Sequence, residues 1–368
     1  MVGLGLLFAA VEDPRAANAR HDLSEILFIA FAAVLCGAES CVDMAAFGAS
    51  KAELLASVLA LEHGVPSHDT FSRVFGSLDP EQFEIAFRAF MTRFAAAISG
   101  QIGTAGQVIA LDGKSLRGAV DAAKRTQPLH LVTAWAAEHR LVLGLKRAPG
   151  RSEVTAAREI IAMLDLTATT VTADALHGNR ATAAAIRERG GDYVLALKGN
   201  RGALHDATQA LLADADTQKA AITIEKSHGR HEERCAWVRE VPKHWAKQYE
   251  FKDLAAVARI DALRRVNGEE TRQTRYYVLS RVLDAAEALH VVRAHWSIEN
   301  NQHWLLDVAL AEDRAHTRND RTAENIALLR RLALNLLRAD PAKGSIRLKV
   351  KRAGWKDDYL LSLLRQMR

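Results

Sequence analysis

Cysteine is scarce in this chain, and it never occurs in the paired spacings that bind zinc. The three cysteines, Cys36, Cys41 and Cys235, are an odd number and form no CxxC pair. This pattern excludes a zinc ribbon and argues against a disulfide framework. It favours a protein of the reducing cytoplasm.

Long hydrophobic runs and glycine-rich ligand motifs are also missing. The apolar run at residues 26–38 is too short to span a bilayer, so we expect a buried helix and no membrane association. No phosphate-binding loop, dinucleotide fingerprint or HExxH motif is found. Their absence removes the functional classes that these motifs mark.

The chain does have ample apolar material and an uneven charge distribution. With 368 residues, 49% of them hydrophobic and 25% charged, it is predicted to be globular with two or three domains. Residues 313–368 hold 14 Lys and Arg against six Asp and Glu, a local charge of +8, whereas the whole chain carries +5. We interpret this end as an arm that meets DNA phosphates; a solvated helix face is the alternative.

Hydrophobic periodicity divides the chain into an all-helical beginning, a mixed α/β middle and a helical, basic end. Aromatic residues are only 6% of the chain, and the abundant alanine favours helices. A linker at residues 100–106 ends the first helical part, and the pattern then changes to short strands. The predicted segments are a helical domain (1–100), the first part of a catalytic domain (101–219), a β-rich insertion (220–281), the helical end of the catalytic domain (282–340) and a basic C-terminal tail (341–368).

A weak helix-turn-helix pattern lies at residues 62–75. A glycine turn precedes a polar helix that can offer Ser67, Thr70 and Arg73 to DNA bases. Ordinary helix packing is the alternative interpretation.

Two aspartates stand at the ends of two apolar strands, which is an unusual place for this residue. Asp112 follows the strand 108–111, and Asp174 follows the strand 169–173. Aspartate disfavours strands, and ligands bind at strand ends in open sheets. Two neighbouring carboxylates repel unless a cation lies between them, and oxygen ligands select Mg²⁺ or Mn²⁺. Each aspartate taken alone is better explained as a turn or helix-cap residue.

A third acidic residue lies on a predicted helix with a mixed polar and aromatic face. At helical spacing, this face contains six side chains. They are Trp296, Glu299, Asn300, His303, Trp304 and Asp307. The face is too polar for a core stripe and too aromatic for a solvated surface. It is typical of a pocket wall; a buried ion-pair network packed on tryptophan is the alternative.

Taken together, these motifs resemble the DDE transposases of bacterial insertion sequences, specifically the H-repeat-associated branch. The resemblance runs from about residue 13 to residue 340. The matching pieces, in order, are DPR at 13–15 with His21, VPSHDTF at 65–71, IALDGK at 109–114, DALH at 174–177, YVLALKGN at 193–200, HWSIENNQHW at 295–304 and NIALLRRLALNLL at 325–337.

The resemblance implies an α/β protein with a ribonuclease-H-like catalytic domain. Asp112, Asp174 and Glu299 would be the catalytic residues and the ligands of Mg²⁺ or Mn²⁺. The implied partner is double-stranded DNA, both the terminal inverted repeats of the element and its target. A homodimer is expected in the DNA complex, and a cytoplasmic location, at the nucleoid when DNA is bound.

Further residues near the three acids are candidate DNA contacts. Lys114, Arg117 and Lys198 lie just beyond strand ends and can hold phosphates, although each is also acceptable as a surface cation. His303 and Trp304 are expected to orient Glu299 or to stack on a distorted end base.

The sequence departs from the wider family around Glu299. The flanking Tyr, Arg and Lys of that family are replaced by Val292, His295 and Leu306, so their DNA contacts do not carry over. Asn179 and Arg201 stand where glutamines are expected in this branch. Two alternatives to a transposase stay open at this point: a transposase-derived DNA-binding regulator, and a nuclease without strand transfer.

Overall fold

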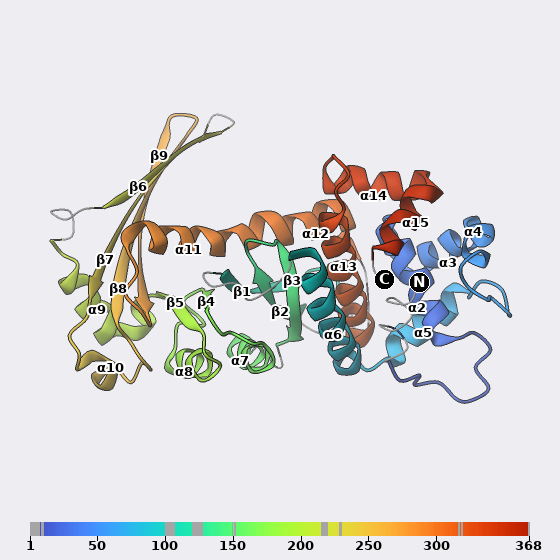
Figure 1. The fold of residues 1–368 in the computed structure, drawn as a ribbon, viewed down its shortest axis with the longest axis horizontal. Helices are drawn as coiled ribbons and strands as arrows, with labels where there is room; N and C mark the ends of the chain where they lie inside the picture. Colours follow the sequence, from blue (N-terminus) through green and yellow to red (C-terminus); the bar gives the residue numbers. More distant parts are fainter. Residues whose placement is uncertain are drawn as a thin grey trace.

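A computed structural model describes residues 8, 11–99, 107–119, 128–148, 150, 152–214, 220–227, 230–315, 317 and 319–366 (Figure 1). The linker predicted at residues 100–106 lies outside these residues. None of the described helices is long and apolar enough to cross a membrane.

A sheet of nine strands runs through the described part of the molecule in the order β3-β2-β1-β4-β5-β9-β8-β7-β6. Its strands are β1 (Gln107–Leu116), β2 (Leu129–Ala136), β3 (Leu141–Arg147), β4 (Thr169–Ala173), β5 (Asp192–Leu197), β6 (Ala221–Ser227), β7 (Arg230–Glu240), β8 (Ala256–Val266) and β9 (Glu269–Leu279). β1, β4 and β5 are mutually parallel, and all other pairings are antiparallel. The fold is therefore mixed α/β, as predicted.

Helices cover the two faces of this sheet and form a separate lobe beside it. Before the sheet come α2 (Leu23–Leu35), α3 (Cys41–Ser50), α4 (Ala52–Ala56), α5 (His68–Ser77) and α6 (Pro80–Ser99). Between the strands are α7 (Glu153–Met163), α8 (Arg180–Glu188), η2 (Gly199–Arg201), α9 (Gly202–Leu211) and α10 (Trp245–Gln248). After them follow α11 (Ala285–Ile298), the π-helical turn η4 (Glu299–His303), α12 (Trp304–Leu310), η5 (Glu312–Arg314), α13 (Asp320–Ala339), α14 (Ile346–Trp355) and α15 (Asp357–Arg365).

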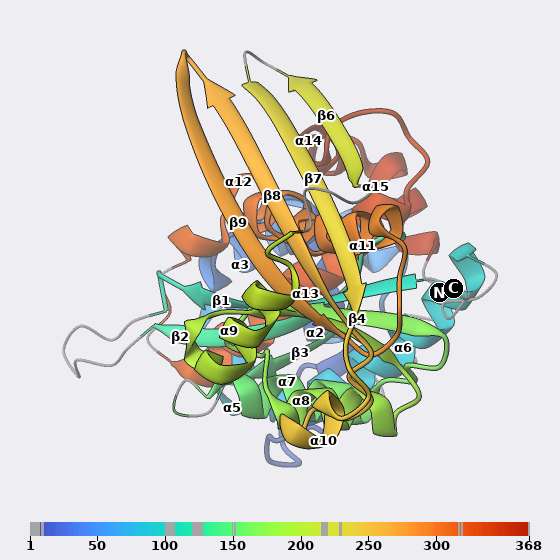
Figure 2. The same ribbon diagram turned by 90° about the vertical axis from the view of Figure 1, so that its left-hand side faces the viewer.

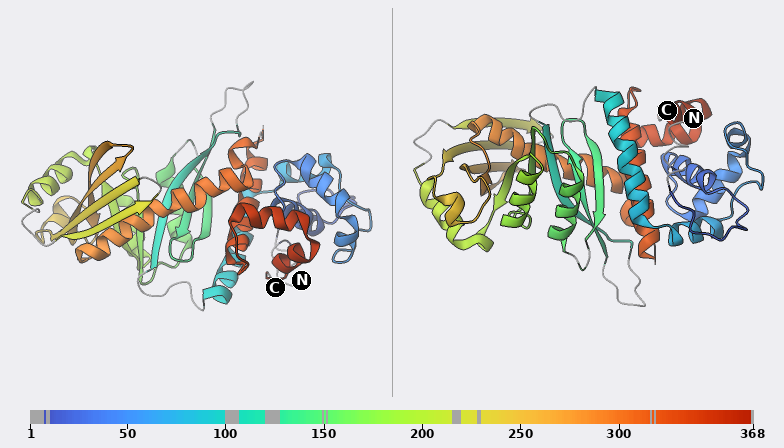
Figure 3. Two further views of the ribbon diagram at one scale, coloured as in Figure 1. Left: turned by 90° about the horizontal axis from the view of Figure 1, so that it is seen from above. Right: turned by 60° about the horizontal axis from the view of Figure 1, so that its bottom comes forward.

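Alternate residues of β1 belong to different hydrophobic cores, because successive side chains of a strand point to opposite faces. Ile109 and Leu111 pack with residues of α7 and α8. Val108 packs with α11, which crosses the other face of the sheet (Figures 1 and 3). By this alternation Asp112 and Lys114 face the side of α11.

β1 is longer than the sequence predicts, and this changes the setting of Asp112. The predicted strand ends at residue 111, whereas β1 continues to Leu116 because its antiparallel pairing with β2 persists to Leu116↔Leu129. Only the parallel pairing with β4 stops early, at Leu111↔Ala173. Asp112 therefore lies inside a strand but at the end of its parallel ladder, while Asp174 directly follows β4.

Strands β6–β9 continue the main sheet, which the sequence did not predict. β9 pairs with β5 through Val194↔Leu279 to Leu197↔Tyr276, and β8, β7 and β6 follow outward. Their far ends project beyond the helices as a twisted β-arm (Figure 2). The predicted β-rich insertion (220–281) therefore extends the sheet formed by β1–β5.

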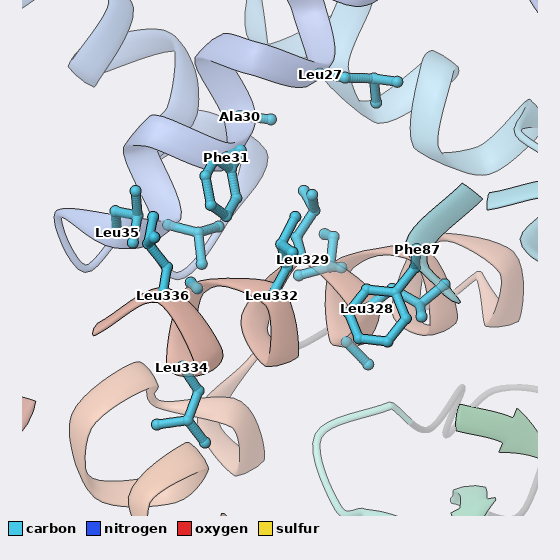
Figure 4. Close-up of a cluster of buried hydrophobic side chains, with 14 of the residues drawn as sticks. Leu27, Ala30, Phe31, Leu35, Phe87, Leu328, Leu329, Leu332, Leu334 and Leu336 are labelled. Atoms are coloured by element: carbon cyan, nitrogen blue, oxygen red, sulfur yellow. The ribbon is translucent and has the colours of Figure 1, made fainter. Parts of the chain in front are cut away.

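The helical lobe is built around α2, which is buried on all sides. Asp22 caps α2 by accepting a hydrogen bond from the Glu25 backbone N–H. The apolar face of α13 packs against α2, as the leucines and Phe31 show in Figure 4. Four phenylalanines of α6, Phe83, Phe87, Phe90 and Phe94, are buried in the same core.

The residues predicted to be a basic tail are folded as α14 and α15, and this lobe contains them. Leu360, Leu363 and Leu364 of α15 are buried in the helical core. Lys349 is also buried, and its ammonium donates to the carbonyls of Leu337 and Asp340. Amino-acid composition could not predict that this segment is folded, since it does not show which charged side chains are buried and paired. Much of the positive charge nevertheless stays on the surface.

Candidate active site

A pocket of about 710 Å³ opens where the parallel part of the sheet meets α11 and the β-arm. Asp112, Asp174 and Glu299 all line it. The other walls come from the end of β5, from α9 and from the facing residues of β8 and β9. The structure thus brings together the three acids that the sequence singles out.

The register of the sheet places the two aspartates on neighbouring strands. Asp112 and Asp174 each follow the last parallel pair, Leu111↔Ala173, and adjacent strands are about 4.8 Å apart. Asp174 Oδ1 accepts hydrogen bonds from the backbone N–H of Leu176 at 3.0 Å and of His177 at 3.4 Å. This turn holds the carboxylate at the strand end, with 48% of the side chain exposed.

Glu299 reaches the pocket from a break in the long helical segment over the sheet. It is the first residue of the π-helical turn η4, and its side chain is exposed. π-Helical turns occur frequently at functional sites. Two residues earlier, Ser297 is fixed to the sheet, because Trp135 Nε1 donates to its hydroxyl at 3.3 Å.

The surroundings of Asp112 disfavour its ionised form. Burial raises the pKa of Asp112 to about 7, helped by the nearby carboxylates of Asp174, Glu299 and Glu153 and opposed by a hydrogen bond from the Gly113 backbone. A bound cation would offset this repulsion and favour the ionised carboxylate. Among the described residues, no group of three or more potential ligands is already gathered as a metal cluster.

Two histidines lie beside the carboxylates and are neutral at pH 7. His303 Nδ1 is 3.5 Å from Asp112 Oδ2, and burial lowers the pKa of His303 to about 3. His295 lines the pocket, and burial lowers the pKa of its imidazole to about 4. Neither ring therefore adds a positive charge, and the His303 ring lies next to the Asp112 carboxylate.

A second cluster behind Asp112 was not found from the sequence. Glu153 lies 2.7 Å from His130 Nε2 and 3.4 Å from His177 Nε2, and hydrogen bonds from these two rings lower the pKa of Glu153 to about 2. A Cβ at Gly113 would come within 2.5 Å of His130 Nε2 and 2.8 Å of Glu153 Oε2. The DALH motif at 174–177 contained the one available signal, His177.

The proposed DNA contacts near the site fall into different environments. Lys198 is exposed at the pocket, and Arg117 is exposed beyond the end of β1. Trp304 is 57% exposed. Lys114, in contrast, is buried and surrounded by carboxylates.

Ser67, Thr70 and Arg73 lie on α5, in the helical lobe at the opposite end of the molecule from the β-arm (Figure 1). Ser67 is the N-cap of α5, since its hydroxyl accepts from the Thr70 backbone N–H at 3.3 Å. Ser67 and Arg73 are exposed, and Thr70 is half-buried.

The β-arm contributes pocket residues that the sequence did not indicate. The Arg275 guanidinium lies 4.0 Å from the ring centre of Trp296, and both residues line the pocket together with Tyr276. A neighbouring groove along β7–β9 shares Arg275, Trp296 and Glu299 with the pocket. Strand alternation alone gives no hint that β9 faces Glu299, because this depends on how the strand joins the sheet.

Two family models and several related proteins point to the same family. A family model described as "Transposase DDE domain" matches residues 103–336, and one described as "DDE_Tnp_1-associated" matches residues 6–91. "Putative transposase YncI" of Escherichia coli O157:H7 is 34% identical over 355 residues, covering 94% of this chain and 90% of that protein. "H repeat-associated putative transposase YhhI" of Escherichia coli K12 is 33% identical over 356 residues, covering 94% of this chain and 92% of that protein.

The chain therefore belongs to the DDE transposase family, in its H-repeat-associated branch. A transposase DDE domain is the domain of a nucleic-acid-cleaving enzyme. Domains of this kind generally use divalent metal ions, and their partner is DNA.

Proposed function

We propose that the chain cleaves DNA at the ends of an insertion sequence and joins those ends to target DNA, with Asp112, Asp174 and Glu299 as catalytic residues. One observation carries this proposal: three carboxylates, from β1, from the turn after β4 and from the helical segment over the sheet, line one pocket. The order β3-β2-β1-β4-β5, with three antiparallel strands before two parallel ones, supports a ribonuclease-H-like catalytic domain.

The donor set fits Mg²⁺ or Mn²⁺, since carboxylate oxygens are the ligands that these hard ions prefer. The raised pKa of Asp112 supports this fit, because it reflects burial first and neighbouring carboxylates second, and a bound cation would offset both. When bound, such ions would activate the attacking oxygen and stabilise the leaving oxygen of an in-line displacement.

The remaining residues of the pocket would position the DNA. Lys198 presents its ammonium at the pocket edge, where it can neutralise a phosphate beside the scissile bond. Trp296, with Arg275 on its ring, offers a flat surface against which a base or sugar can pack. His303 orients Asp112 from the side of the helix. We further propose a homodimer in the DNA complex and a cytoplasmic, nucleoid-associated location.

The proposal is tested with a duplex that carries the inverted repeats flanking the gene. We expect cleavage in Mg²⁺ or Mn²⁺, none in chelator, and joined products when target DNA is added. Cleavage without joined products would identify a nuclease instead. Specific binding with no cleavage under any divalent ion would identify a DNA-binding regulator.

The exposed cations of the C-terminal helices are expected to bind phosphates. Arg347 and Lys351 of α14 and Lys356 after it are exposed. Changing all three to Ala should weaken binding to any duplex and make the salt dependence shallower by about 1 to 3 in log–log slope. Point changes are needed here, because deleting residues 341–368 would remove α15 from the core.

The matched control changes three exposed lysines on the opposite side of the molecule, Lys243, Lys247 and Lys252, to Ala. A salt titration of specific and random duplexes compares both variants with the wild type. Equal slopes for the two triple variants would show that α14 makes no special contribution.

Sequence preference is expected to depend on α5. Changing Thr70 and Arg73 to Ala, and Ser67 to Asn, should reduce the affinity ratio between element ends and random DNA by about tenfold or more. Asn is used at position 67 because it caps helices as well as Ser does. Competition binding measures the ratio. An unchanged ratio would place base recognition outside α5.

A further inference from the structure

Lys114 is 8% exposed and lies among three carboxylates, although the sequence suggested that it holds a DNA phosphate. Its Nζ is 2.7 Å from Asp307 Oδ1, 3.1 Å from Asp313 Oδ1 and 3.3 Å from Glu312 Oε2. A phosphate at this place would meet the repulsion of these acids and could not displace them without leaving buried charge unpaired. The ammonium is therefore committed to contacts inside the protein.

The contact with Asp307 is one of two successive contacts between β1 and the helical segment that carries Glu299. Asp112 and Lys114 are on the same face of β1, and His303 and Asp307 are four residues apart on the helical segment. His303 Nδ1 lies 3.5 Å from Asp112 Oδ2, and Asp307 contacts Lys114. Two strand residues span about 6.6 Å and four helical residues about 6 Å, so the two contacts fit without bending either element.

The far side of the ammonium is fixed to a rigid framework. The side chains of Glu312 on η5 and Arg331 on α13 are fully buried, and Arg331 donates to Glu312 Oε1 at 2.6 Å. The end of β1 packs tightly on the same loop, since a Cβ at Gly118 would lie 2.5 Å from the Ala315 carbonyl oxygen. Lys114 thus connects three elements: β1, α12 and the loop held by α13.

We propose that Lys114 is a positioning residue: by holding Asp307 of α12, its ammonium sets the separation between Asp112 and Glu299. The π-helical turn η4 runs from Glu299 to His303, so a shift of α12 along β1 would move Glu299 directly. This role rests on the proposed function, because the separation matters only if the two carboxylates share cations.

The test removes the contact on α12 and leaves the ammonium buried and paired. In Asp307→Asn, Lys114 keeps Glu312 and Asp313 as partners, so the fold should persist, which a melting curve checks. Mn²⁺ binding to the full chain is measured by electron paramagnetic resonance. We expect affinity to fall by about tenfold or more, the usual effect of losing a group that orients ligands. Asp307→Glu, which keeps the charge, should restore part of it.

The matched variant is Asp313→Asn, which removes the same charge from the same ammonium. Asp313 lies on η5, beyond the helical segment that carries Glu299. Asp313→Asn should therefore lower the Mn²⁺ affinity by about threefold or less, clearly less than Asp307→Asn does. The Mg²⁺ concentration for half-maximal DNA cleavage should follow the same order.

Two outcomes would overturn the role of Lys114. Equal losses in Asp307→Asn and Asp313→Asn would indicate a general effect of charge, and no loss in Asp307→Asn would exclude positioning. Failure of the proposed function looks different, since the wild-type chain itself would then bind no Mn²⁺ and cleave no DNA. A DNA contact by Lys114 is tested separately with Lys114→Met, whose folding a melting curve checks: the salt dependence of binding should be unchanged in Lys114→Met and shallower in Lys198→Met.

Discussion

Replacing Glu299 with glutamine is expected to reduce DNA cleavage by about 10²- to 10³-fold or more, the effect of removing a group that stabilises transition-state charge. Glutamine has nearly the shape of glutamate but no charge, and the Glu299 side chain is exposed. The fold and DNA affinity should therefore survive. Nicking rates in Mg²⁺ and binding at fixed salt measure the two effects.

The control for this variant is Glu287→Gln on α11, which removes the same charge far along the same helical segment and breaks a surface pair with Arg281. Surface pairs contribute little, so this variant should cleave normally. A Glu299→Gln protein that cleaves at the wild-type rate would remove Glu299 from the catalytic site.

Replacing Asp112 with asparagine should abolish cleavage but stabilise the metal-free protein near neutral pH. Burial raises the folded-state pKa of Asp112 to about 7, above the value near 3.9 of an unfolded chain. Between these values the folded state binds more protons, so wild-type stability falls as pH rises. Asparagine cannot ionise and avoids this loss.

The free energy of unfolding of Asp112→Asn is expected to exceed that of the wild type by about 2 to 4 kcal/mol at pH 8, since a tenfold change in proton affinity is worth about 1.4 kcal/mol. This difference should vanish as the pH is lowered towards 4. Denaturant titrations at several pH values in chelator measure it, and Mg²⁺ should stabilise only the wild type. A constant difference between the two proteins at all pH values would mean that Asp112 does not titrate in this way.

Short apolar strands were predictable because their burial is encoded locally. The residues directly before Asp112 and Asp174 favour buried strands by their own composition, and both strands occur in the structure. The β-rich character of residues 220–281 was also predictable, but the position of β8 was not, because Arg259, Arg264 and Arg265 interrupt its apolar pattern. Its formation depends on pairing with β7 and β9 on both sides, which no local pattern reveals.

The face of the Glu299 helix was predicted only in part, because the prediction assumed a regular α-helix. The π-helical turn inserts extra backbone after Ile298 and changes the direction of the following side chains. His303 consequently turns towards Asp112, whereas Trp304 is 57% exposed. The roles of Lys114 and Lys349 were equally hidden, since sequence shows a charge without showing what neutralises it.

The most direct test of the central claim is the position of Mn²⁺ in a crystal of the protein bound to DNA carrying its inverted repeats. Anomalous scattering locates the ions independently of any assumption about catalysis. The account predicts Mn²⁺ between the carboxylates of Asp112, Asp174 and Glu299, next to a DNA phosphate. Mn²⁺ bound elsewhere, or a DNA phosphate in this pocket with no ion beside the three carboxylates, would contradict it.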